Sequence, residues 1–174
     1  LPSPGVGGPC LTKDSFMLGI NDKEKSVILS ARYLNQDMVK FTADKIVDIS
    51  RGVTGKILII GVAFKGVPAT NDLRQSTPIE ICRELIEAGI SISAIDAVAT
   101  SHEISEQGIP IFEELTDDHN VICILNNNPE NVKIFRDILN IWSKLRQVNN
   151  ARLVLFDPWG IIASSDISNY NVDR

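Results

Sequence analysis

Apolar residues recur at spacings of three and four along residues 22–49, and this period predicts one long helix of about 40 Å. Asn21 and Glu24 are similar to a capping box, and neither proline nor glycine interrupts the stretch before Gly52. The apolar positions form two seams, a first seam of Val27, Ala31, Leu34, Met38 and Phe41 and a second seam of Val39, Ala43 and Ile46. Either the helix lies in the core of one domain, or it joins two domains and pairs with a second subunit. We favour the second interpretation, because nothing later in the sequence is large enough to cover both seams.

Short apolar runs alternate with helical patterns after this helix, which indicates a second domain with a mainly parallel sheet. Strands are expected at 56–62, 91–95, 109–112, 121–125 and 153–156, and helices at 77–89, 101–107 and 129–145. The last strand is expected to close the sheet, with a polar tail after it. The predicted fold is therefore α/β, a long connecting helix followed by a Rossmann-like sheet domain with flanking helices. Residues 1–52 would form the first unit and residues 53–174 the second.

Two loops of the predicted sheet domain follow strands, where parallel sheets bind their ligands. They span residues 64–76 and 126–128. Thr77 is expected to cap the helix after the first loop, with Pro78 in its first turn, Glu80 completing a capping box and Gly89 ending it. The dinucleotide fingerprint G-x-G-x-x-G is absent from residues 61–66, so this domain does not read as a standard NAD domain.

Composition narrows the class of protein. The chain has 174 residues, 44% of them hydrophobic and 22% charged, as in ordinary globular proteins. Its net charge of -5 argues against a nucleic-acid surface, and no apolar run reaches the roughly 20 residues that span a bilayer. Three cysteines far apart, without C-x-x-C spacing, indicate a reducing compartment rather than a disulfide framework or a metal site. The expected location is the cytoplasm.

Candidate chemistry lies at the start of the chain. The glycines Gly5, Gly7 and Gly8 allow a tight turn and a close approach to a ligand, and Cys10, Lys13 and Asp14 follow them. A thiol attacks as its thiolate, which a neighbouring cation favours, so these residues form a candidate unit for covalent catalysis. The alternative is a glycine loop before a buried, structural cysteine. His102 and His119 lie in polar segments and are expected at the surface without a catalytic role. Trp159 is expected to serve packing.

Residues 5–14, GVGGPCLTKD, resemble the active-site cysteine segment of the UDP-glucose/GDP-mannose dehydrogenase family. A second stretch agrees, since GVAFKG at 61–66 and NDLRQSTP at 71–78 are similar to the G-x-A-F-K and D-x-R-x-S-P run of that family's C-terminal domain. The resemblance covers the whole chain, and Pro9 departs from many members. It implies the C-terminal part of a nucleotide-sugar 6-dehydrogenase, with the NAD domain N-terminal to the cysteine segment and outside this chain.

The resemblance also implies roles for individual residues. Gly5, Gly7 and Gly8 would line the substrate site, Phe64 and Lys65 would contact the nucleotide of a UDP-sugar, and Arg74 would reach the phosphates of NAD. Cys10 would carry the intermediates of two successive oxidations of the sugar C6 alcohol, with Asp14 orienting water and Lys13 biasing the local charge.

Three hypotheses remain open at this stage. The first is the dehydrogenase, a homodimer through residues 22–49, in which the chain alone is expected to be inactive. The second is a non-catalytic nucleotide-binding or dimerisation module. The third is an unrelated thiol enzyme, which the absence of a second cysteine near Cys10 disfavours. The residues do not distinguish glucose, N-acetylglucosamine and N-acetylmannosamine as the sugar.

Overall fold

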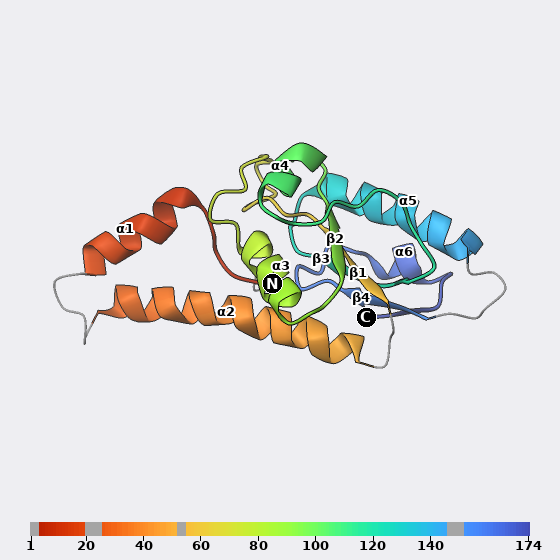
Figure 1. The fold of residues 1–174 in the computed structure, drawn as a ribbon, viewed down its shortest axis with the longest axis horizontal. Coiled ribbons are helices and arrows are strands. Elements are labelled where there is room, and N and C mark those ends of the chain that lie inside the picture. The colour runs from red at the N-terminus through yellow and green to blue at the C-terminus, as the bar shows by residue number, and fades with distance from the viewer. Residues whose placement is uncertain (1–3, 20–25, 52–54, 146–151) are drawn as a thin grey trace.

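A five-stranded, entirely parallel sheet forms the centre of the sheet domain in the computed structural model, which describes residues 4–19, 26–51, 55–145 and 152–174. The strands are β1 (Lys56–Ile60), β2 (Ile92–Ile95), β3 (His119–Ile124), β4 (Leu153–Phe156) and β5 (Val172–Asp173), in the order β2-β1-β3-β4-β5. The helices are α1 (Pro9–Gly19), α2 (Val27–Ser50), α3 (Thr77–Glu87), α4 (Ser101–Glu106), α5 (Pro129–Leu145) and α6 (Ser164–Ile167). The α/β prediction with a parallel sheet and a long helix before it is confirmed (Figure 1).

Helices cover both faces of the sheet, which is why its central strands are apolar at consecutive positions. Side chains alternate between the faces, so Ile57 and Ile59 pack in one cluster while Leu58 and Ile60 pack in another. The first cluster includes the second seam of α2 and the apolar face of α3. The second is filled from α5, by Phe135, Ile138, Leu139 and Trp142. Within the part of the chain that the structure describes, no helix is long and apolar enough to span a membrane.

Helix α2 is shorter than predicted and only one of its seams is covered. It begins after Ser26, whose side chain accepts a hydrogen bond from the backbone N–H of Leu29. The predicted capping box of Asn21 and Glu24 lies outside the described residues. The second seam is buried against the sheet, whereas Val27, Leu34 and Phe41 of the first seam are 81%, 64% and 54% exposed. The expectation that both seams are covered is therefore not met within this chain.

Helix α1 differs from the sequence prediction, which places the cysteine in a loop. Its first residue is Pro9 and its second is Cys10. Proline suits the first position of a helix because its missing N–H has no partner there in any case. The Thr12 hydroxyl donates to the carbonyl of Gly8, closing the first turn. Figure 1 shows α1 and the N-terminal part of α2 extending together to one side of the sheet.

Three further details differ from the sequence predictions. The cap residue of α3 is Ser76 rather than Thr77, and the Ser76 hydroxyl donates to the Val62 carbonyl instead of capping the helix. The stretch 109–112 makes only an isolated bridge between Ile111 and Ala94. Strand β4 does not close the sheet, because the supposed polar tail contains α6 and returns as β5 beside it. A strand of two residues carries too short a pattern to be recognised from period alone.

Candidate functional site

The glycine segment lies against the loop that precedes α3, so two motifs far apart in the sequence meet. The backbone N–H of Gly8 donates to the carbonyl of Gln75 at 2.9 Å. A side chain at Gly7 would place its Cβ 2.4 Å from that same oxygen, so the approach requires glycine. A Cβ on Gly8, at φ +110°, would lie 3.1 Å from the Phe64 ring. These contacts bring Gly7 and Gly8 beside the loop of Phe64 and Arg74, as the proposed shared site requires.

Asn35 of α2 holds the same glycine segment from the other side, and sequence reasoning missed it. Its amide donates to the Val6 carbonyl at 2.9 Å, and its oxygen accepts from the Val6 N–H at 2.7 Å. The paired bonds anchor the segment just before Cys10. The one signal in the sequence is an asparagine inside a predicted helix. Asparagine is unfavourable in helix interiors unless its side chain bonds to a backbone group.

The candidate thiol unit lies on α1, and helical spacing places its three residues on one face. Cys10 precedes Lys13 and Asp14 by three and four residues, which are neighbouring positions on a helix surface. Cys10 is exposed, and the Lys13 ammonium lies 3.9 Å from the Asp14 carboxylate. The alternative of a buried, structural Cys10 is therefore wrong. Cys82 and Cys123 are the buried thiols, and burial raises the pKa of Cys82 to about 12 and that of Cys123 still further.

Phe64 and Lys65 leave the carboxyl end of β1 in a loop that other loops hold in place. The Lys65 ammonium lies 5.2 Å from the centre of the Phe64 ring, and Lys65 is exposed. The N–H of Gly66 donates to the Asn127 side chain, from the loop after β3. The amide of the buried Asn126 donates to the Ala63 carbonyl at 2.8 Å. The two predicted ligand loops thus meet at the carboxyl edge of the sheet.

Asp96, at the end of β2, has a structural role in this edge. One carboxylate oxygen accepts the backbone N–H groups of Val62 and Ala63, and the other accepts those of Val98 and Ala99. Four backbone donors occupy this side chain, so it stabilises the loops rather than presenting a free acid. The Trp159 indole donates to the Leu125 carbonyl at 3.0 Å, which agrees with the packing role expected for it.

Arg74 is exposed and held in a fixed orientation by Asp72. Its guanidinium makes two hydrogen bonds to the Asp72 carboxylate, at 3.0 and 2.7 Å. These bonds lower the pKa of Asp72 and raise that of Arg74. Because Gly8 bonds to Gln75, the residue after Arg74, the cysteine segment and this cation lie in one region.

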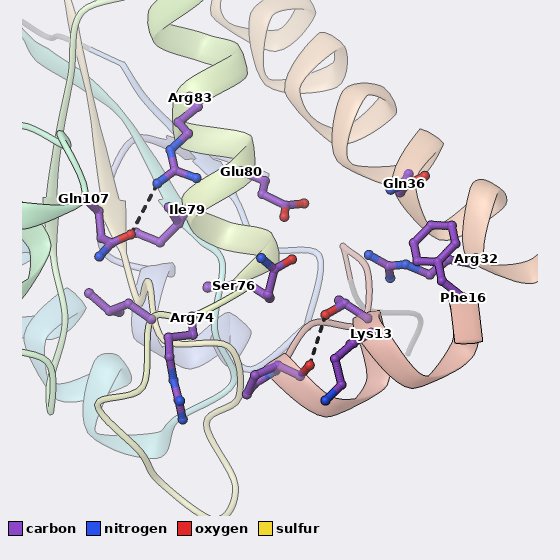
Figure 2. A pocket seen from close by; sticks show the side chains of 14 residues that line it. Lys13, Phe16, Arg32, Gln36, Arg74, Ser76, Ile79, Glu80, Arg83 and Gln107 are labelled. Atoms are coloured by element: carbon purple, nitrogen blue, oxygen red, sulfur yellow. Dashed lines mark hydrogen bonds between the residues drawn. The ribbon is translucent and has the colours of Figure 1, made fainter. Parts of the chain in front are cut away.

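An open groove of about 690 Å³ lies between α1, α2 and the start of α3 (Figure 2). Helix α1 contributes Thr12, Lys13 and Phe16, and Arg74 comes from the loop before α3. The groove also contains Arg32 of α2, which the sequence did not single out. Cys10 and Asp14 are not among the residues that line this groove.

The expectation that His119 lies at the surface is wrong, because this residue is 3% exposed and lies in β3. Its Nδ1 accepts the backbone N–H of Thr116, so Nε2 carries the proton and faces Ser93 Oγ at 3.3 Å. A protonated Nε2 cannot remove the serine proton, so this pair is structural. Burial lowers the pKa of His119. His102 is exposed, as expected, and its Nε2 lies 3.6 Å from the Glu106 carboxylate.

Comparison with known proteins gives consistent matches. Residues 58–164 match the UDP binding domain of the UDP-glucose/GDP-mannose dehydrogenase family. The chain is 31% identical over 146 residues to UDP-N-acetyl-D-mannosamine dehydrogenase of Methanocaldococcus jannaschii, covering 83% of this chain and 33% of the relative. It spans about a third of the length of such relatives.

Two solved structures share the fold. The first is an NDP-N-acetyl-D-galactosaminuronic acid dehydrogenase of Methanosarcina mazei, with a TM-score of 0.72 and 22% identity over 99% of this chain and 38% of the other. The second is a UDP-D-ManNAc dehydrogenase of Pyrococcus horikoshii, with a TM-score of 0.67 and 24% identity over 94% of this chain and 37% of the other.

Proposed function

This chain belongs to the UDP-glucose/GDP-mannose dehydrogenase family, and we propose that it is the C-terminal portion of an NAD-dependent UDP-sugar 6-dehydrogenase. The observation that carries the proposal is the contact between Gly8 and Gln75, which joins the cysteine segment to the loop of Arg74. That contact joins the segment of the exposed Cys10 to the loop before α3, at the carboxyl edge where parallel sheets bind ligands, and so supports a reaction of this thiol with a bound nucleotide sugar. We place the enzyme in the cytoplasm, as its cysteine usage suggests.

Cys10 is proposed to carry the covalent intermediates. The thiolate attacks the C6 aldehyde that the first oxidation produces, which forms a carbon–sulfur bond and gives a thiohemiacetal. Loss of a hydride from C6 and a proton from the hydroxyl leaves a thioester. Water then attacks the carbonyl carbon, and the carbon–sulfur bond breaks to release the carboxylate and Cys10. NAD, when bound, accepts the hydride of each oxidation.

Lys13 and Asp14 have secondary roles in this proposal. They lie on the same face of α1 as Cys10, so the Lys13 ammonium stabilises negative charge that develops on the C6 oxygen. Asp14 orients the water that attacks the thioester. A carboxylate alone does not activate a thiol, so Asp14 ranks below Cys10 in importance.

The nucleotide is proposed to bind at the carboxyl edge of the sheet. Phe64 supplies an apolar surface and Lys65 a cation there, and the glycines before Cys10 allow the substrate to approach the backbone. Arg74 fits a phosphate of NAD, because its exposed guanidinium is already oriented by Asp72. Residues 61–66 lack the G-x-G-x-x-G fingerprint that would bind the rest of NAD, so the chain alone is expected to produce no NADH.

We also propose a homodimer through α2. The first seam is exposed, and an apolar hollow lined by Val6, Leu11 and Val27 continues it toward α1. A row of exposed apolar side chains along one helix commonly marks an interface. A second copy of the same helix presents the same seam, so a two-fold pairing would cover both.

Titration of the 174-residue chain with UDP tests the proposal. Lys65→Ala should weaken UDP binding at least about tenfold, because a charge-assisted hydrogen bond contributes about 1.5–3 kcal/mol. Arg74→Ala should change UDP affinity much less, since its partner is the NAD phosphate. Equal losses of UDP affinity in the two variants would contradict the separate roles proposed for Lys65 and Arg74. A folded chain that does not bind UDP would contradict the nucleotide-sugar assignment. The runner-up, a non-catalytic nucleotide-binding module, predicts the same UDP binding but no protection of Cys10 by a UDP-sugar.

A further inference from the structure

A loop of three consecutive asparagines, residues 126–128, follows β3 at the carboxyl edge of the sheet, and the function proposed above gives it no role. The first two of these side chains bond to the loop after β1. Asn126 is 2% exposed, and its side-chain amide donates to the Ala63 carbonyl at 2.8 Å. The side-chain oxygen of Asn127 accepts the backbone N–H of Gly66 at 3.1 Å. Two neighbouring asparagines thus hold two separate points of one loop.

The two points lie on either side of Phe64 and Lys65, the residues to which we assign the nucleotide. Between them, the Lys65 ammonium lies 5.2 Å from the centre of the Phe64 ring. A lysine loses much rotamer freedom when it is fixed on a ligand. Because the backbone is already held before and after this pair, binding does not have to order the loop as well.

Other bonds fix the first part of the same loop. One carboxylate oxygen of Asp96 accepts the N–H groups of Val62 and Ala63, and the N–H of Phe64 donates to the Asp72 carbonyl at 3.2 Å. These partners hold the loop as it leaves β1, whereas the two asparagines hold it around the exposed cation. The loop is therefore ordered in the ligand-free chain.

Close packing makes the two loops depend on each other. A Cβ on Gly61, at φ +86°, would lie 2.5 Å from the Cβ of Asn126, and a Cβ on Gly66 would collide with the backbone nitrogen of Asn128. Backbones this close leave the loop after β1 little room to shift unless the asparagine loop shifts with it.

A buried polar network fixes the asparagine loop in turn. The side-chain oxygen of Asn126 accepts the backbone N–H of Asn128 at 2.8 Å and the side-chain amide of Asn131 at 3.3 Å. Asn131 is 0% exposed, and its oxygen accepts the N–H of Ala97, after β2. A satisfied buried network of this kind rigidifies the groups that it joins. The amide of Asn126 is therefore held facing the loop after β1.

We infer that Asn127, supported by Asn126, is a positioning residue that holds Phe64 and Lys65 in the arrangement that binds UDP. The inference rests on the nucleotide site proposed above. Neither asparagine has to contact the nucleotide, because each acts through the loop between them and the ligand. A loop that is ordered before binding gives up less conformational freedom, and the ligand binds more tightly for that reason.

Titration calorimetry with UDP on the 174-residue chain tests the inference. Asn127→Ala should weaken UDP binding by about two- to tenfold, as expected when a loop side chain must be ordered on binding. In a chain that already carries Lys65→Ala, the same substitution should change UDP affinity much less, because the positioned cation is gone. An asparagine with a merely structural role would show no such dependence on Lys65.

Asn140→Ala is the matched control. Asn140 is an exposed asparagine of α5, and its side-chain oxygen also accepts one hydrogen bond, from the Tyr170 hydroxyl at 2.8 Å. Its loss removes a similar bond at a distance along the helix from the carboxyl edge, so UDP affinity should stay at the wild-type value.

Hydrogen exchange of the Gly66 amide measures the order of the loop without a ligand. Asn127→Ala should speed this exchange, whereas Asn127→Asp, which keeps an oxygen acceptor, should leave it slow. The inference alone is overturned if the wild type binds UDP and Asn127→Ala binds it equally well, if the loss of affinity is the same with and without Lys65, or if Gly66 exchange does not change in Asn127→Ala. A folded wild type that does not bind UDP overturns the proposed nucleotide site, and the inference with it.

Discussion

Gly7→Ala should separate the cysteine segment from the loop before α3. The new Cβ would lie 2.4 Å from the Gln75 carbonyl oxygen, whereas ordinary contacts begin at 3.4 Å. The two segments would have to move apart by about 1 Å, which stretches the Gly8–Gln75 hydrogen bond from 2.9 Å beyond bonding distance. Losing that bond costs about 1 kcal/mol and the residual crowding about as much again. We expect the free energy of unfolding to fall by about 2 kcal/mol.

Denaturant unfolding measures this loss, and limited proteolysis locates it. The detached segment should be cleaved before Cys10 faster than in the wild type, while the sheet domain remains resistant. Gly89→Ala is the control, because Gly89 has φ +78° with nothing near its hypothetical Cβ. That substitution should cost about 1 kcal/mol through backbone strain alone and leave cleavage near Cys10 unchanged. Wild-type stability and wild-type cleavage in Gly7→Ala would refute the reasoning.

Three further predictions concern the buried histidine, the helix seam and the thiols. Because burial lowers the pKa of His119, protonation favours the unfolded chain, so its contribution to stability should be complete above pH 6.5 and fall below it. His119→Gln should reduce the difference in the free energy of unfolding between pH 5.5 and pH 7.5. An unchanged difference would contradict the assignment. Leu34→Asp should give a folded monomer where the wild type sediments as a dimer, since it puts a charge in the exposed seam. A wild-type monomer at micromolar concentration would count against the dimer. Iodoacetamide should label Cys10 in the native chain and spare Cys82 and Cys123, and a UDP-sugar should slow the labelling; labelling of the buried pair first would be inconsistent with this fold.

The sequence determined the elements whose pattern is long and local. Strand β1 is a continuous apolar run bounded by glycines, and α5 follows Asn128, whose side chain accepts from the N–H of Glu130 as a helix-starting asparagine does. Such signals depend on neighbours in the chain, so they can be read without a fold. The two glycine- and charge-rich motifs were sufficient to identify the family.

Burial and pairing that depend on residues distant in the chain appear only in the tertiary structure. His119 reads as polar and exposed until β3 places it beside Ser93, and β5 is too short to recognise until it pairs with β4. Arg32 looks like any helix-surface cation in the sequence, and only the packing of α1 against α2 buries it. Hydrophobic period reports whether a position is buried on average, but it does not say which charged side chain becomes buried. That outcome is set by the packing of segments distant in the chain.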